Sequence, residues 1–287
     1  MNLLAMAMIF GSTFTHALWN MIAKQAKDKH IFFWLTKVAE VGLFIVPFLV
    51  MLRYYPVPVR SLIFVFGSGT VGFLYYIFLA KAYDGGDLSV AYPIARCALL
   101  FVPLLSFFFI GERLSGIGII GIFVILAGVF LLHLEGTSLR TIKRNFLKWS
   151  TFFALLTAFC SAVYSLIDKV AVDYINPFMY FFLFNMLIGV YYSFFVMIKS
   201  DRASLVSEWA GNKRNIISVA ILNILTYTVV LFAFQMSKVS YAVAVRQFSI
   251  VVGVFMGIRL LKEKHFMNRL VASLVIFIGI VLVGIAK

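Results

Sequence analysis

Ten apolar runs, each near the length of a membrane-spanning helix, occupy most of this 287-residue chain. A helix needs about 20 apolar residues to cross the hydrocarbon core of a bilayer. The runs cover approximately residues 3–23, 31–52, 61–80, 88–110, 116–133, 149–167, 177–198, 215–236, 239–258 and 270–286. Because the runs are continuous, they predict helices, whereas membrane β-strands would alternate over about ten residues. The chain is 63% hydrophobic and 13% charged, a composition that requires the bilayer as solvent.

Little chain remains outside these runs, so a function has to reside within or between the helices. The two cysteines, Cys97 and Cys160, lie in apolar runs, and we expect them to be small buried hydrophobes rather than a disulfide framework. We find no Walker motif, no HExxH, no paired-cysteine metal pattern and no catalytic triad. We therefore predict a protein that is not an enzyme, with no metal site and no cofactor. The first run lacks the features of a signal peptide and is interpreted as the first span.

The net charge of +14 does not indicate nucleic-acid binding, because the basic residues are scattered over short loops. Most of them follow the first, third, fifth, seventh and ninth runs and therefore lie on one side of the membrane. The positive-inside rule places this side in the cytoplasm. With an even number of spans, both termini are then predicted to face outward.

The two halves of the chain resemble each other in sequence. Residues 82–91 (AYDGGDLSVA) align with 233–242 (AFQMSKVSYA) at an offset of 151. Near the start of each half, FTHALWNMIAK aligns with FCSAVYSLIDK at an offset of 145. The offset of 151 also pairs Glu112 with Glu263 and Gly128 with Gly279. This pattern predicts an internal repeat.

Each half contains five runs, and an odd number of spans makes the second half enter the membrane in the opposite orientation. We therefore predict an all-α polytopic membrane protein of ten transmembrane helices, built as a 5+5 inverted repeat around a central cavity. The predicted boundaries are 1–134 for the first repeat, 135–148 for a basic connecting loop and 149–287 for the second repeat.

The ten spans, the AYPIAR segment followed by a span ending in GER, and HALWN in the first span resemble the EamA branch of the drug/metabolite transporter superfamily. The resemblance extends over essentially the whole chain. It implies ten helices around a central cavity and secondary export of amino acids, other metabolites or toxic compounds. It also implies that both termini face the cytoplasm, contrary to the charge distribution. The second half departs from the pattern, with Ala244 at the position of Pro93 and Gln247 at that of Arg96.

Arg96 and Arg246 are candidate substrate-binding residues, because each lies well inside an apolar run. Placing a charge there costs roughly 2.5–3.5 kcal/mol, so such residues are expected to face a wet cavity or a partner. A guanidinium group can bind a carboxylate or phosphate through two parallel hydrogen bonds. The alternative is that these arginines extend to the lipid headgroups or pair with an acid such as Asp87.

Lys37 and Glu40 lie three residues apart and share one face of the second helix. One interpretation is a self-neutralising pair in the bundle interior. The other makes Glu40 a candidate proton-coupling carboxylate and Lys37 a substrate contact.

His16, Trp19 and Asn20 form one stripe on the first span and are candidate substrate-binding residues, with helix–helix hydrogen bonding as the alternative. At the matching positions of the second half stand Ser161, Tyr164 and Ser165. Most tyrosines near these helices, Tyr75, Tyr76, Tyr83 and Tyr227 among them, are expected to be interfacial or lipid-facing.

Two other tyrosines, Tyr92 and Tyr241, are candidates for substrate binding because each precedes a span arginine by four or five residues, and Gln247 is added as the neighbour of Arg246. Glu112 and Glu263 each end a span beside basic residues. We expect both to be structural, as ion pairs or helix caps.

These observations favour a secondary transporter of the plasma (inner) membrane that exports small anionic or zwitterionic metabolites such as amino acids by alternating access. The expected partners are that substrate and the bilayer, with protons as a further candidate, a monomer sufficient and no nucleic acid bound. Alternatives within the same fold are an exporter of lipophilic cationic drugs and a lipid-carrier flippase. From other classes, a non-transporting scaffold or sensor stays open, and an intramembrane enzyme lacks a recognisable nucleophile or acid pair.

Overall fold

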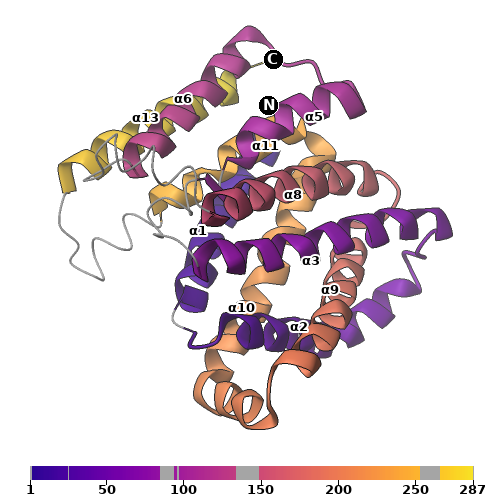
Figure 1. Cartoon of the computed structure of the whole chain (residues 1–287). Helices are drawn as coiled ribbons and strands as arrows, with labels where there is room; N and C mark the ends of the chain where they lie inside the picture. The colour runs from indigo at the N-terminus through magenta and orange to yellow at the C-terminus, as the bar shows by residue number, and fades with distance from the viewer. Residues whose placement is uncertain are drawn as a thin grey trace.

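The computed structural model of the protein describes residues 2–24, 26–84, 94–95, 97–133, 149–252 and 266–286. The regular elements in these ranges are all helices (Figure 1). In chain order they are α1 (Leu3–Lys24), α2 (Lys29–Leu52), the 3₁₀ turn η1 (Val59–Ser61), α3 (Leu62–Asp84), α5 (Ala98–Ile110), α6 (Gly116–His133), α8 (Trp149–Ala171), α9 (Pro177–Lys199), α10 (Arg202–Met236), α11 (Val239–Arg246) and α13 (Phe266–Ile285).

Five helical segments in the described ranges are long and apolar enough to cross a membrane: Lys29–Leu52, Val59–Ala82, Trp149–Ala171, Pro177–Lys199 and Arg202–Met236. Shorter apolar helices, Ala98–Ile110, Gly116–Leu131, Val239–Val252 and Leu270–Ile285, fall within other predicted runs. The prediction of an all-helical membrane protein is thereby confirmed, and the count of ten spans stays a prediction.

The segment before the eighth predicted span is helical, and the expectation of a loop there was wrong. Helix α10 begins at Arg202 and continues for 35 residues. Asp201 caps its N-terminus, because the Asp201 carboxylate accepts a hydrogen bond from the backbone N–H of Ser204 at 2.8 Å. The hydrogen bonds from Ser204 stabilise the charged form and lower the pKa of Asp201. The basic residues of this segment, Arg202, Lys213 and Arg214, lie exposed on the helix.

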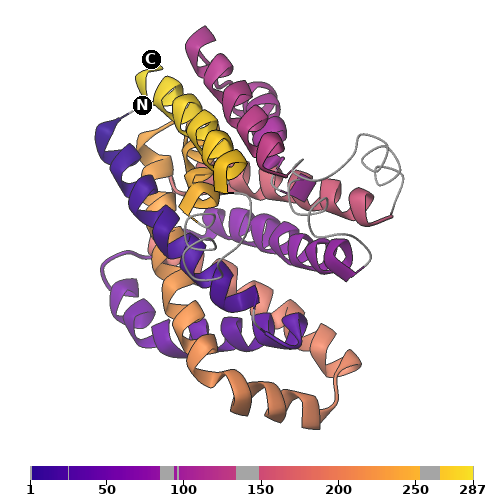
Figure 2. The ribbon, with the colours of Figure 1, turned by 90° about the vertical axis from the view of Figure 1, so that its left-hand side faces the viewer.

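Each helix of the first half packs against helices of the second half (Figures 1 and 2). Four pairs make extensive contact: α6 with α13, α3 with α8, α1 with α10, and α2 with α9. A further pair, α5 with α11, joins the two elements that flank the centre of the bundle. The start of α1 and the end of α13 lie close together in both views.

The fourth and ninth predicted spans are both interrupted by a tight turn. Helix α11 ends at Arg246, and helical structure resumes at Phe248. In the first half, α5 begins after a turn at Cys97. The two turns have the same three-residue hydrogen-bond spacing, with N–H to C=O bonds from Cys97 to Ile94, Leu100 to Cys97, Gln247 to Ala244 and Ile250 to Gln247. Interrupted helices are found where membrane helices line a binding site.

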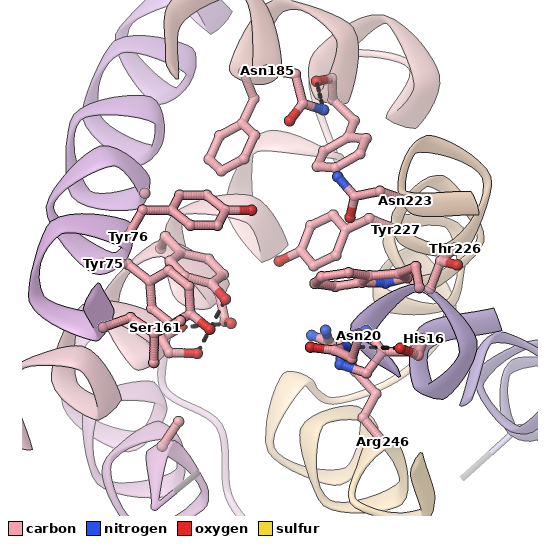
Figure 3. Close-up of a pocket in the computed structure, with 18 of the residues that line it drawn as sticks. His16, Asn20, Tyr75, Tyr76, Ser161, Asn185, Asn223, Thr226, Tyr227 and Arg246 are labelled. Carbon is pink, nitrogen blue, oxygen red and sulfur yellow. Dashed lines mark hydrogen bonds between the residues drawn. The ribbon is translucent and has the colours of Figure 1, made fainter. Parts of the chain in front are cut away.

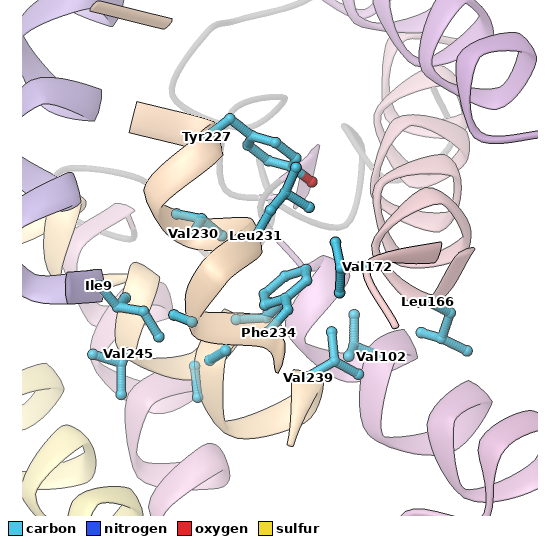
Figure 4. Close-up of a cluster of buried hydrophobic side chains, with 14 of the residues drawn as sticks. Ile9, Val102, Leu166, Val172, Tyr227, Val230, Leu231, Phe234, Val239 and Val245 are labelled. Carbon is cyan, nitrogen blue, oxygen red and sulfur yellow. The ribbon is translucent and has the colours of Figure 1, made fainter. Parts of the chain in front are cut away.

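Part of the buried apolar core lies where the end of α8, the later part of α10 and the start of α11 meet (Figure 4). Its side chains are contributed by α1, α5, α8, α10 and α11, and Phe234, Val102 and Val239 are fully buried within it. We call this region the apolar plug and define it by Ile9, Val102, Leu166, Val172, Val230, Leu231, Phe234, Val239 and Val245.

Glu112 ties the rim of the apolar plug together. Its carboxylate accepts the backbone N–H of Val239 at 2.6 Å and the hydroxyl hydrogen of Ser240 at 2.7 Å. It therefore caps α11 from the end of the helix that packs beside it, where a negative charge is favourable. Lys238 Nζ donates to the Arg113 carbonyl at 2.7 Å across the same boundary. Glu263, the predicted counterpart, lies outside the described residues.

A glycine contact between α6 and α13 provides a test of this packing. A Cβ atom added to Gly279 would lie 2.8 Å from the Gly121 carbonyl oxygen and 2.7 Å from a side-chain carbon of Ile125. We predict that Gly279→Ala lowers the free energy of unfolding by about 1–3 kcal/mol, because two backbones must separate. Thermal unfolding in detergent measures the change. Gly42→Ala is the control, since nothing lies within 4 Å of its added Cβ, and equal effects in the two variants would contradict the contact.

Candidate functional site

A cavity lined by polar and apolar side chains, with about 110 Å³ of room for water-sized molecules, lies between the two halves. Figure 3 shows two facing walls, with Tyr75, Tyr76 and Ser161 from α3 and α8 on one side. The other wall carries residues of α1, α10 and α11, and Asn185 of α9 lies between the walls. The apolar plug borders this space through Tyr227, which belongs to both the cavity lining and the buried cluster.

Six of the residues predicted to bind substrate line this one cavity, although they come from three separate helices and the turn after α11. They are His16, Trp19, Asn20, Lys37, Arg246 and Gln247. Tyr241 does not line it, and its hydroxyl instead accepts the Ser115 backbone N–H at 3.0 Å near the start of α6. Tyr92 and Arg96 lie outside the described residues.

Lys37 and Glu40 form an ion pair with almost no exposure, 2% and 0%. Lys37 Nζ lies 3.1 and 3.2 Å from the two carboxylate oxygens of Glu40 and donates to Asn185 Oδ1 at 2.8 Å. Asn223 Nδ2 donates to Glu40 Oε1 at 2.8 Å. A buried pair is tolerated when further hydrogen bonds satisfy both partners, and here α9 and α10 supply them to α2. Lys37 faces the cavity, whereas Glu40 lies behind it.

Arg246 presents a cation to the cavity with no acid within ion-pair distance in the described ranges. Within the described ranges the Lys37–Glu40 pair is the one ion pair below 4 Å, so Arg246 has no such partner there. Its guanidinium carbon lies 5.1 Å from the centre of the Tyr227 ring, a cation–π contact. The Tyr227 ring is itself stacked on Phe181 at 4.7 Å. The arginine is thus supported by an aromatic face and left able to bind an anion.

The stripe on α1 contributes donors and an aromatic surface. His16 and Trp19 meet edge to face with 5.1 Å between ring centres, and Asn20 Nδ2 donates to the His16 carbonyl at 2.7 Å. The indole nitrogen of Trp19 is buried and has no hydrogen-bond partner in the described structure. A buried N–H without a partner costs free energy.

Several lining residues were missed or misjudged from the sequence. Asn185, Asn223 and Thr226 stand alone in apolar runs, and that isolation was the available signal, because polar groups in a membrane helix face a partner or a cavity. The tyrosines expected at the interface, Tyr75, Tyr76 and Tyr227, also line the cavity, so that interpretation was wrong for them. Ser161, Tyr164 and Ser165 line it as well.

No group of three or more His, Cys, Asp or Glu side chains in the described ranges is arranged to hold a metal ion. The donors around the cavity are amides, hydroxyls, an indole and two basic groups, a set suited to an organic ligand with oxygen acceptors.

An apolar helical bundle around a polar cavity lined by both halves of the chain defines a polytopic membrane protein of the transporter class. The sequence model of the EamA-like transporter family matches this chain twice, over residues 3–134 and over residues 148–285. The chain therefore belongs to the EamA-like transporter family and is a membrane transporter of the drug/metabolite type.

Solved structures add support for the fold. One of them, described as "Crystal structure of protein", has a TM-score of 0.75 over 98% of this chain and 98% of its own, at 17% sequence identity. At this identity the likeness establishes the fold alone. A comparison with curated proteins found no match.

The Lys37–Glu40 pair gives a testable stability effect. We predict that Lys37→Met lowers the free energy of unfolding by about 3–5 kcal/mol, because Glu40 is left charged and buried. Adding Glu40→Gln should recover most of this loss, which thermal unfolding of both variants would measure. Lys213→Met on the exposed part of α10 is the control. Additive losses in the double variant would show that the two side chains do not compensate each other.

Proposed function

We propose that the protein is a secondary transporter that exports small anionic or zwitterionic metabolites, such as amino acids, by alternating access. The observation that carries this proposal is the unequal state of the two cations in the cavity. Lys37 is neutralised by Glu40, whereas Arg246 has no acid within 4 Å in the described ranges. A substrate carboxylate bound to Arg246 would balance that charge.

The surrounding donors and surfaces fit such a substrate. The indole ring of Trp19 lines the cavity beside these polar groups. The rings of Tyr76, Tyr164 and Phe184 offer apolar surface to the rest of the molecule. A binding cavity of this kind fixes a ligand by few polar groups and much apolar contact.

The pairing of the helices supports an inverted repeat. The sequence repeat equates α1 with α8, α2 with α9, α3 with α10 and α6 with α13. Under this exchange the α3/α8 pair becomes the α10/α1 pair, and the α2/α9 and α6/α13 pairs become themselves. Such a bundle can pack in a second, mirrored way at similar cost, which is the basis of alternating access.

The charge distribution supports a direction for the present state. If the basic loops lie in the cytoplasm, the apolar plug lies toward the outside and the cavity is reached from the cytoplasm. This arrangement suits a protein of the plasma (inner) membrane that loads its substrate inside the cell. The substrate gradient or a proton gradient would supply the energy, with Glu40 as one proposed coupling group.

The alternatives fit less well. Export of lipophilic cations would need an available carboxylate, but Glu40 is engaged by Lys37 and Asn223 and does not line the cavity. A lipid-carrier flippase would need a lateral opening between helices. A scaffold or sensor would leave the polar cavity without a role.

We predict that Arg246→Gln abolishes transport while the protein stays folded in the membrane, because a neutral amide cannot balance a carboxylate. Counterflow of labelled amino acids into liposomes containing the purified protein measures the activity. Arg202→Gln, at an exposed position of α10, is the control. The same loss is expected for Arg96→Gln. Normal transport by both the Arg246→Gln and the Arg96→Gln proteins would refute the anion site, and silence of the unmodified protein over a broad panel would favour the scaffold.

The Glu112 cap gives a test of the gate. We predict that Glu112→Gln makes the plug end open more often, since a charged acceptor for the α11 N-terminus is lost. A cysteine introduced at Val102, in a protein with Cys97 and Cys160 replaced by alanine, should then react several-fold faster with an impermeant maleimide.

The control for the gate is Asp201→Asn, which alters a carboxylate that caps α10 away from the boundary between the halves. Equal labelling rates in the Glu112→Gln and Asp201→Asn proteins would contradict a role of the Glu112 cap in closing this end.

A further inference from the structure

A second buried carboxylate, Asp168 on α8, lies next to the cavity and has no part in the site described so far. Its exposure is 0%. Three hydroxyl groups from three other helices donate to it: Tyr180 of α9 at 2.6 Å, Tyr227 of α10 at 2.7 Å, and Ser68 of α3. A carboxylate that accepts three hydrogen bonds is a built site rather than an accident of packing.

Asp168 has no cation within ion-pair distance in the described ranges. On its own helix, Lys169 is directed elsewhere and donates to the Phe234 carbonyl at 2.7 Å. The cation that interacts with Asp168 electrostatically is Arg246, from α11. Burial and the three hydrogen bonds act on the Asp168 carboxyl more strongly than Arg246 does, and Arg246 also faces the cavity.

Tyr227 joins the two charged groups physically. Its hydroxyl donates to Asp168 Oδ2, its ring lies under the Arg246 guanidinium, and it lines the cavity. A change in the charge of Asp168 or of Arg246 is therefore transmitted to the other group through the side chain of Tyr227.

We propose that Asp168 is a proton-binding site linked to the anion site at Arg246, so that the transporter carries a proton together with an anionic substrate. This inference rests on the proposed anion site. When a carboxylate binds Arg246, the guanidinium charge is balanced by the ligand and no longer stabilises the Asp168 carboxylate. Asp168 then accepts a proton more readily, and by reciprocity the proton strengthens anion binding.

Protonation of Asp168 reverses its hydrogen bond with Tyr227. A proton adds to Asp168 Oδ2, and the new O–H donates to the Tyr227 oxygen. An ionised carboxylate only accepts hydrogen bonds, so the former Tyr227 donor loses its acceptor when Asp168 becomes an acid. The Tyr227 hydroxyl hydrogen turns toward the cavity, where a ligand oxygen can accept it. A monoanion and one proton then cross as a neutral pair, so export in this mode is driven by the outward gradient of the substrate and not by an inward proton gradient.

The groups that face Asp168 favour it over Glu40 for this role. Helix α5, which packs on α8, has no ionisable side chain, and the other neighbours contribute Ser68, Tyr180, Tyr227 and Arg246, with Tyr164 on α8 itself. Glu40, in contrast, has Lys37 at 3.1 Å, which favours its carboxylate form independently of Arg246.

Infrared spectroscopy tests the linkage without any ligand. A protonated carboxylic acid has a carbonyl band that a carboxylate lacks, and Asp168→Asn should remove the band assigned to Asp168 while Glu40→Gln leaves it. At a fixed pH between about 4 and 9, this acid band should be stronger in Arg246→Gln than in the unmodified protein, because the stabilising cation is gone. Arg202→Gln should leave the band unchanged.

A second arm uses benzoate as the probe anion and benzamide, its neutral analogue, as the control. Benzoate should strengthen the Asp168 acid band and bind about tenfold more tightly for each pH unit lowered in the linked range, and benzamide should do neither. Tyr227→Phe keeps the ring under Arg246 but removes the hydroxyl, and should weaken the dependence of benzoate binding on pH.

Absence of an Asp168 acid band over the whole pH range, or a band that Arg246→Gln does not change, would overturn the proposal even if transport itself is confirmed. Conversely, a band that responds to Arg246→Gln but not to benzoate would retain the electrostatic link and refute its use in anion binding. If Arg246→Gln abolishes transport but neither the infrared band nor benzoate binding behaves as expected, the proposed transport function stands and the proposed proton coupling is refuted.

Discussion

A charged or polar group inside a membrane bundle has to be compensated there, because lipid offers no hydrogen bonds. In this protein the compensation comes largely from the other half of the chain. Lys37 and Glu40 of the first half are completed by Asn185 and Asn223 of the second. Asp168 of the second half is completed in part by Ser68 of the first. The two halves are therefore held together by hydrogen bonds that each supplies to buried polar groups of the other, as well as by apolar packing.

The same constraint explains where the cavity and the plug lie. Polar side chains gather between the facing walls of α3/α8 and α1/α10/α11, and one end is filled by apolar residues such as Phe234 and Val239. Glu112 satisfies the backbone N–H of Val239 at the rim, so the end of a helix can lie next to the dry plug without unpaired donors. The closed end and the cavity thus follow from the positions of a few polar and apolar residues.

The sequence predicted much of the fold because its signal is strong and local. Long apolar runs define membrane helices without tertiary information, and span residues such as Lys37 and Arg246 are conspicuous because they are costly. Asp168 was missed because it lies at the end of a run, beside Lys169, where it resembles an ordinary boundary charge. Its three hydroxyl partners come from distant segments and carry no local pattern. The helical start of α10 was missed because its residues are polar, and polarity there reflects exposure rather than a loop.

The exchange of partners between halves has a consequence for how the protein is made. The major helix pairs all join one half to the other, so the first half emerges from the ribosome before any of its partners exist. During synthesis, Lys37 and Glu40 can neutralise each other but lack the amides that later complete them. The early helices are therefore expected to stay loosely associated, or to be held by the insertion machinery, until α9 and α10 have been synthesised. Errors in biogenesis are expected to concentrate in this interval.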